Sequence, residues 1–135
     1  MCNRENDCSC FRDTLCLIVK LQKKDQCLDN DLSCSRPYLG GSNSSLTYNT
    51  RPISFYSCNS NTAWTMPYTL NGVDGTSQVF RCEAVDGCCC TCRVLAPNTD
   101  TTSDLPYVAT DNFFTVNLNC MGCLRCLDDT YIACI

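Results

Sequence analysis

The segment that most constrains this chain is Glu83–Cys92, EAVDGCCCTC, in which three cysteines are adjacent and a fourth follows one residue later. Adjacent cysteines rarely bond to each other, because the small ring strains the geometry that a disulfide requires. The whole chain has 16 cysteines among 135 residues, about 12%, and more than roughly 8–10% is typical of a cross-linked scaffold. These sulfur atoms therefore need partners elsewhere, in the same chain or in another.

Charge and composition exclude several function classes. The net charge is −4 and there is no basic run or stripe, which argues against nucleic acid as a partner. The chain contains no histidine, so no imidazole can act as the base for a serine or cysteine nucleophile. Asp128 and Asp129 are adjacent and would point apart on a strand. The sequence predicts no catalytic residue, no cofactor and no enzymatic activity.

The cysteine content and the N-terminus indicate different compartments. The apolar run 15–19 ends at Lys20, whereas a secretory signal needs roughly 7–15 apolar residues. No stretch is long enough to span a bilayer, so we expect no membrane insertion. Disulfides rarely persist in a reducing cytosol. Three explanations are open: the thiols bind metal, the protein is released when its cell dies, or a signal was removed earlier.

A structural metal is one alternative use of so many thiols. Cys120-x-x-Cys123-x-x-Cys126 resembles the first three ligands of an iron–sulfur sequence, but Thr130 stands where the fourth cysteine would follow. Zinc could use any four thiolates, yet paired CxxC knuckles at a familiar spacing are missing. We therefore assign no metal ligand, and a zinc or iron protein stays an alternative.

Hydrophobic periodicity predicts one domain with a single N-terminal helix. Residues 1–10 are expected to form a flexible, cysteine-bearing arm, and residues 11–135 the domain. The helix is predicted over residues 11–24, with lysines 20, 23 and 24 at its C-terminal end. Its apolar stripe consists of Phe11, Leu15, Ile18 and Leu21.

The rest of the domain is predicted to be mainly β and sandwich-like. Short runs of β-branched and aromatic residues lie between turn signals such as Asn71-Gly72 and Asp74-Gly75. Several short strands at this spacing indicate a sandwich or a small barrel. The predicted strands are residues 51–57, 61–70, 77–85, 90–96, 113–120 and, less regularly, 130–135.

Alternation predicts the register of the two strands on either side of the cysteine run. A two-residue loop at 86–87 would pair Phe80 with Arg93 and place an apolar face against a charged one. A three-residue loop at 86–88 pairs Phe80 with Val94 instead. Because register follows the buried face, we expect the longer loop with a bulge. The further predicted pairs are Cys82 with Cys92 and Ala84 with Cys90.

The predicted environments divide the cysteines into two groups. Cysteines on inward faces should be small core residues or intramolecular bridges, and those on the arm, at the turn or on an outer face should bond to a neighbouring molecule. The intramolecular or core candidates are Cys82, Cys90, Cys92, Cys120 and Cys126. The intermolecular disulfide candidates are Cys2, Cys8, Cys10, Cys88 and Cys89.

Several segments, in their order and rough spacing, resemble the CotY/CotZ/ExsY family of cysteine-rich spore coat, crust and exosporium proteins. The N-terminal arm, the helix FRDTLCLIVKLQ and the cysteine pair Cys27…Cys34 also fit, whereas loops 38–48 and 98–112 match poorly. The resemblance therefore covers most of the chain. The matching segments are NTRPISFYS, VFRCEAVD, CRVLAP and FFTVNLNCMGCLRCLDD.

The chain also departs from this family. Cys82 and Cys92 stand where relatives often have aliphatic residues, and the C-terminal spacing is CxxCxxC in place of CxCxxxC. The histidine-rich tails of the family are missing. Specific disulfide pairings therefore cannot be transferred, although Cys89, Cys120 and Cys126 match family cysteines.

The resemblance implies a structural protein that assembles with itself. Such proteins form rings, here expected to be hexamers, that pack into two-dimensional, often hexagonal, lattices toughened by disulfides. They are made in the mother-cell cytoplasm without a signal peptide and reach the spore surface, the exosporium or outer coat. Other spore coat or exosporium proteins are the implied partners. A metal-binding protein and a secreted disulfide-rich binding module are the alternatives.

Overall fold

A computed structural model describes residues 8–29, 48–58, 62–133 and 135 of the chain. Over these residues the protein is mainly β, with one α-helix and two antiparallel sheets, as predicted for a sandwich-like domain. The elements are, in chain order, α1 (Ser9–Asp29), β1 (Ile53–Ser57), β2 (Met66–Leu70), β3 (Val73–Ser77), β4 (Phe80–Asp86), β5 (Cys89–Pro97), β6 (Tyr107–Asn117), the 3₁₀ turn η2 (Leu118–Cys120) and β7 (Met121–Cys126).

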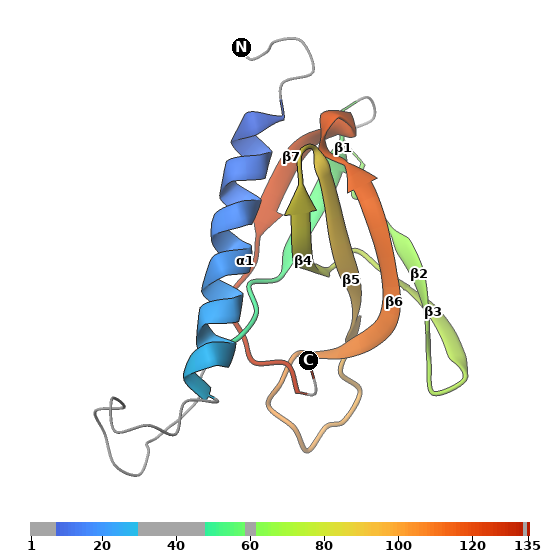
Figure 1. Cartoon of the computed structure of the whole chain (residues 1–135). Coiled ribbons are helices and arrows are strands. Elements are labelled where there is room, and N and C mark those ends of the chain that lie inside the picture. Colours follow the sequence, from blue (N-terminus) through green and yellow to red (C-terminus); the bar gives the residue numbers. More distant parts are fainter. Residues whose placement is uncertain (1–7, 30–47, 59–61, 134) are drawn as a thin grey trace.

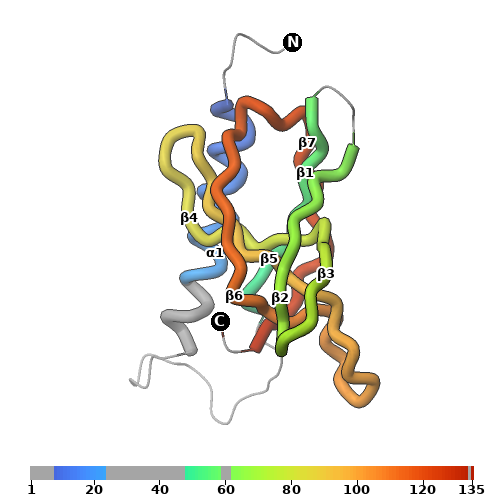
Figure 2. Tube along the Cα trace, turned by 90° about the vertical axis from the view of Figure 1, so that its right-hand side faces the viewer, coloured from blue at the N-terminus to red at the C-terminus, as the bar shows by residue number. Residues whose placement is uncertain are grey.

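Five strands form the main sheet, in the order β6-β5-β4-β1-β7, and β2 pairs with β3 in a separate hairpin. β1 and β4 pair through Ile53 and Phe80 alone, so the two halves of the main sheet splay apart. Figure 1 shows α1 running alongside the main sheet and the β2–β3 hairpin on the opposite side. In the view turned by 90°, the hairpin lies toward the viewer and α1 on the far side (Figure 2).

The core lies between α1, the main sheet and the β2–β3 hairpin. Phe80 is at its centre, stacked 6.3 Å from the ring of Phe55 and edge-on to Phe114 at 4.8 Å. Residues from all three layers pack on these rings. The fully buried apolar residues include Leu15, Ile53, Phe55, Phe80, Val94, Leu95, Leu118 and Ile132.

Helix α1 is longer than the predicted 11–24 at both ends, and its last turn contains no basic residue. Leu15 and Ile18 are buried as the apolar stripe predicts, but Leu21 is 45% exposed. Gln22, seven residues after Leu15, lies on the inward face instead and is buried. Its amide nitrogen donates to the Cys82 carbonyl at 2.8 Å, which satisfies a polar group inside the core.

The β4–β5 hairpin has the predicted register at one end and a different loop at the other. Phe80 pairs with Val94 and Cys82 with Cys92, as expected. A bulge after Cys82 then shifts the register, so that Ala84 pairs with Thr91 and the loop is the two residues 87–88. The predicted pairing of Ala84 with Cys90 across a three-residue loop is wrong, because the extra residue is absorbed within the strand.

The β2–β3 hairpin has one of the two predicted turns. Asn71 and Gly72 occupy its tip with φ of 54° and 81°, the left-handed conformation that a two-residue hairpin turn requires. Asp74-Gly75, also predicted as a turn, lies within β3. A Cβ at Gly75 would lie 2.7 Å from the Tyr68 ring, so glycine is needed here for a close approach across the hairpin.

Sequence alternation missed β7 and the first half of β6 (107–112). The predicted last strand, 130–135, forms only an isolated bridge between Thr130 and Thr50. β7 escapes prediction because a register shift beside Gly122 breaks its alternation. Among the described residues, no helix has the length and apolar character needed to cross a membrane.

Candidate functional site

Most of the free thiols that the structure describes are either buried or exposed, and Cys16 alone among them is half-buried. Cys82, Cys90 and Cys92, hereafter the core thiols, are completely buried. Cys120, Cys123 and Cys126, hereafter the edge thiols, are exposed at one edge of the main sheet. All six carry free thiols, and the other exposed thiols are those of Cys10, Cys58 and Cys89.

The edge thiols lie on or beside β7, the last strand of the main sheet. β7 hydrogen-bonds to β1 on one side, with Cys123 opposite Tyr56 and Cys126 opposite Ile53, and no described strand pairs with its outer side. The exposed Cys58 lies next to this row, because its amide donates to the Cys120 carbonyl at 3.3 Å. A sheet edge bearing several exposed thiols can therefore meet another molecule without rearrangement of the core.

The predicted burial of Cys120 and Cys126 is wrong. Val116 and Leu118 do lie inward, but the chain then leaves the strand for η2, and the Asn117 side chain caps this turn by accepting from the Asn119 amide at 3.0 Å. The turn breaks the alternation and directs Cys120 outward. Cys126 ends the edge strand, where no described neighbour covers it.

Cys8 and Cys88 form a disulfide within the chain, although both were predicted to bond to a neighbour. Cys8 is buried, and its carbonyl accepts from the Arg12 amide in the first turn of α1. Residues 8–10 therefore belong to the domain and not to a flexible arm. Of the remaining intermolecular candidates, Cys10 and Cys89 are exposed, and Cys2 lies outside the described residues.

The core thiols lie at the predicted inward positions and contact one another. The Cys90 sulfur is 3.0 Å from that of Cys82 and 3.5 Å from that of Cys92. Hydrogen bonds from Cys82 and Cys92 lower the pKa of Cys90, although burial opposes this shift. The contact with Cys90, together with burial, raises the pKa of Cys82, although Cys92 opposes this shift, and contacts with Cys82 and Cys90, together with burial, raise the pKa of Cys92. Cys90 is thus the first of the three to lose its proton.

These distances do not fit a metal site. Zinc–sulfur bonds of about 2.3 Å in a tetrahedron separate the ligand sulfurs by about 3.8 Å. The Cys82–Cys90 contact of 3.0 Å is much shorter. Within the part of the chain that the structure describes, no group of three or more histidine, cysteine or acidic side chains is arranged to hold a metal ion.

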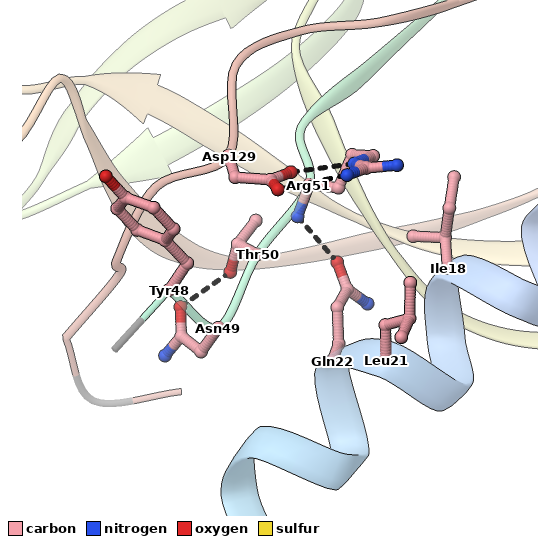
Figure 3. A pocket seen from close by; sticks show the side chains of 8 residues that line it. All are labelled: Ile18, Leu21, Gln22, Tyr48, Asn49, Thr50, Arg51 and Asp129. Carbon is pink, nitrogen blue, oxygen red and sulfur yellow. Dashed lines mark hydrogen bonds and ion pairs between the residues drawn. The ribbon is translucent and has the colours of Figure 1, made fainter. Parts of the chain in front are cut away.

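A polar pocket lies between α1 and residues 48–51. In it, the ion pair of Arg51 with Asp129, hereafter the clasp, joins segments that are far apart in the sequence. Arg51 donates to both carboxylate oxygens of Asp129, at 2.7 and 3.0 Å, and its amide donates to the Gln22 side chain at 3.1 Å (Figure 3). This ion pair holds the pKa of Asp129 below its usual range. The pocket has a volume of about 50 Å³, far below the roughly 300–1,000 Å³ of ligand sites.

An open groove of about 840 Å³ lies beside the edge thiols. Arg125 and Cys126 of β7 line this groove, and so do residues 104–107, which include Tyr107. No histidine lines it, since the chain has none, and one of its carboxylates, that of Asp129, is held in the ion pair with Arg51. The groove is suited to contact another surface.

Comparison of the chain with known protein families, curated proteins and solved structures finds no match. The chemistry of the site is therefore inferred from its own residues. Burial separates an inner set of thiols, which can react with one another, from an outer set, which can reach other molecules.

Proposed function

We propose that this protein is a structural subunit that assembles with copies of itself into a disulfide cross-linked, two-dimensional lattice on the spore surface. The observation that carries the proposal is the group of exposed thiols at the open edge of the main sheet, with Cys123 and Cys126 on β7 and Cys120 in the turn before it. A disulfide requires Cβ atoms about 3.5–4.5 Å apart, and contact between exposed cysteines of neighbouring copies would bring such atoms together. The resemblance to spore coat and exosporium proteins supports the same role.

The two edges of the main sheet provide a way for copies to join. β6 is the edge opposite β7, and its backbone groups are likewise unpaired with any described strand on their outer side. Pairing β7 of one copy with β6 of the next is a head-to-tail contact, which gives a ring where the rotation closes. β6 contains no cysteine, so backbone hydrogen bonds would hold this contact, and the edge thiols would bond to cysteines outside the β6 strand. Such pairing would also satisfy the open backbone groups and protect both edges from random aggregation.

Exposed apolar side chains add surface for packing between subunits. Leu17 and Leu21, one turn apart on the outer side of α1, are 58% and 45% exposed, and Phe113 on β6 is 49% exposed. Burying side chains of this size contributes roughly 1.5–3 kcal/mol each. We expect reversible packing through these surfaces first and covalent locking by the edge thiols afterwards.

The proposed place of action accounts for the redox conflict in the sequence. A chain made in a reducing mother-cell cytoplasm keeps its exposed thiols free. Oxidation after assembly at the spore surface would then fix the lattice and make it resistant to denaturants. Exosporium and outer coat or crust are the candidate layers, and other cysteine-rich spore proteins are the candidate partners.

Electron microscopy of the purified chain tests this proposal. Expressed alone and imaged by negative stain, the chain should form rings or sheets, and boiling detergent without reductant should leave a high-molecular-weight ladder on a gel. Adding reductant should reduce the ladder to monomer. Material that stays a single soluble particle at high concentration under oxidising conditions would exclude the proposal.

A matched pair of variants separates the edge thiols from the other cysteines. Replacing the three edge thiols with serine should remove most of the detergent-resistant ladder while preserving the fold, because all three are exposed. The control is the double variant Cys10→Ser and Cys89→Ser, also at exposed positions but away from β7. If the edge variant keeps the ladder and the control loses it, the cross-links lie at Cys10 and Cys89, and their assignment to the edge thiols is wrong.

A further inference from the structure

The core thiols are a buried sulfur cluster that the proposed assembly does not use. They lie side by side on β4 and β5, at the centre of the main sheet and enclosed by the core. Each is completely inaccessible to solvent, so none of them can bond to another molecule in the folded state. Their contacts with one another therefore need a separate explanation.

We infer that Cys82 and Cys90 form a second oxidation site, at which a peroxide converts the two thiols into a disulfide that joins β4 to β5 inside the core. Their sulfurs are 3.0 Å apart, the shortest separation between free thiols in the described part of the chain. The β4 bulge next to Cys82 explains this contact, because a bulge changes the direction of a side chain and here moves it toward Cys90.

Geometry favours Cys82 over Cys92 as the partner of Cys90. The sulfurs of Cys82 and Cys90 are 3.0 Å apart, whereas those of Cys90 and Cys92 are 3.5 Å apart. Cys92 lies opposite Cys82 in the strand register, but the sulfur of Cys82 is in contact with that of Cys90, and this contact selects Cys90 as its partner. Cys92 therefore stays a thiol when the bond forms.

The reaction balances with hydrogen peroxide as the oxidant. The Cys90 thiolate attacks a peroxide oxygen, an S–O bond forms as the O–O bond breaks, and the leaving hydroxide takes the proton released by the thiol and departs as water. The Cys82 sulfur then attacks the sulfenic sulfur of Cys90. The S–S bond forms, the S–O bond breaks, and a second water leaves with the Cys82 proton. Two thiols lose two electrons, and one peroxide becomes two waters.

The environment of Cys90 suits the first of these steps. The sulfurs of Cys82 and Cys92 lie 3.0 and 3.5 Å from that of Cys90, and either group of each pair can donate. When both neighbours donate, they stabilise the Cys90 thiolate that attacks the peroxide. The pKa of Cys90 is lowered to about 5 by these contacts. Hydrogen peroxide is small and uncharged, so a brief opening of the core suffices for entry, in contrast to a bulky disulfide reagent.

Mass spectrometry on the full chain tests this inference independently of assembly. The purified protein is alkylated in its native state with iodoacetamide, which blocks the exposed thiols, and is then treated with hydrogen peroxide. It is unfolded, its remaining thiols are labelled with N-ethylmaleimide, and the chain is cut after arginine and after glutamate. Cleavage after Arg81 and Glu83 separates Cys82 from the peptide 84–93.

The expected result is a disulfide between Cys82 and Cys90, a loss of about 2 Da per chain, with N-ethylmaleimide on Cys92. Recovery of both Cys82 and Cys90 as labelled thiols after peroxide overturns the inference, and so does a bond between Cys82 and Cys92. The Cys92→Ala variant should keep the bond. Loss of the bond in that variant, with an unchanged far-UV circular dichroism spectrum, contradicts the assignment of Cys92 as a bystander.

Discussion

The core thiols and the edge thiols occupy the same sheet but have different neighbours. Cys90 has two sulfurs of its own chain within 3.5 Å, whereas Cys123 lies on an outermost strand with solvent on its open side. In the centre of the sheet, strand order and register determine which thiols meet. At the edge, no described strand of the same chain lies beyond β7, so another molecule can supply the missing neighbour. Position in the sheet, and not the residue type, thus determines the chemistry of each cysteine.

Thiol labelling should show the largest difference between the two regions. Ellman's reagent should modify the edge thiols at nearly the rate of an unfolded peptide, because they are exposed. Labelling of the core thiols requires opening of the fold, so we expect it to be about a thousandfold slower or more. Comparable rates for the two sets in native buffer would refute the distinction.

Substituting one arginine in each region should lower the free energy of unfolding by very different amounts. Arg81 is buried and donates to Glu83 at 2.7 Å, Thr50 at 2.9 Å and the Asn49 carbonyl at 3.1 Å. Arg81→Leu removes the guanidinium that donates to the Thr50 hydroxyl and the Asn49 carbonyl and leaves Glu83 with Arg93 alone, at 3.2 Å, and should cost about 3–5 kcal/mol in urea unfolding.

Arg125 on the edge strand β7 is the matched control for Arg81. It is exposed, so Arg125→Leu should change the free energy of unfolding by no more than about 0.5 kcal/mol. Equal losses for the two variants would mean that β7 is as rigidly packed as the centre of the sheet.

A third, smaller contrast compares two cysteines that lie two residues apart: Cys8, which is bonded to Cys88, and Cys10, which is a free, exposed thiol. Cys8→Ser removes a bond that closes a loop between residues 80 positions apart, and should lower the free energy of unfolding by about 2–4 kcal/mol. Cys10→Ser removes an exposed thiol and should have almost no effect on stability. A larger loss from Cys10→Ser than from Cys8→Ser, under non-reducing conditions, would contradict the pairing.

The smallest expected effect concerns the clasp between Arg51 and Asp129. The pKa of Asp129 is depressed in the folded state, so its contribution to stability is present above the unfolded value of about 3.9 and is lost as pH falls through the folded pKa. Both side chains are more than one-third exposed, which limits the effect to roughly 0.5 kcal/mol. Arg51→Gln should lose this amount at pH 7 and nothing once the pH lies well below the folded pKa of Asp129. An equal loss at both pH values would exclude charge as its cause.

The centre of the sheet could be predicted from sequence because its strands alternate. Phe80 and Cys82 share one face, and this face fixes their pairing with Val94 and Cys92. The position of the bulge could not be predicted from this pattern; in the structure the extra residue is Glu83, which forms ion pairs with Arg81 and Arg93. Sequence alternation records which face is buried, but not where the extra residue is accommodated.

The edge of the sheet could not be predicted from the sequence either, and the reason is again physical. Neither face of β7 is uniformly buried, so its residues lack the period of two that marks a strand. The pairing of Cys8 with Cys88 depends on how α1 docks against the sheet, which local sequence does not encode. The one signal for the edge in the sequence is the spacing Cys120-x-x-Cys123-x-x-Cys126, which also resembles an iron–sulfur motif.

The most direct test of the account is an isotope-mixing experiment. Equal amounts of ¹⁴N- and ¹⁵N-labelled chain are mixed while reduced, allowed to assemble and oxidise, and digested without reductant for mass spectrometry. We predict that disulfide-linked peptides containing Cys120, Cys123 or Cys126 include hybrids of the two isotopes, whereas peptides linked through Cys82 or Cys90 are always of one isotope. Edge cysteines that are found only in single-isotope links, or only as thiols, would contradict the account.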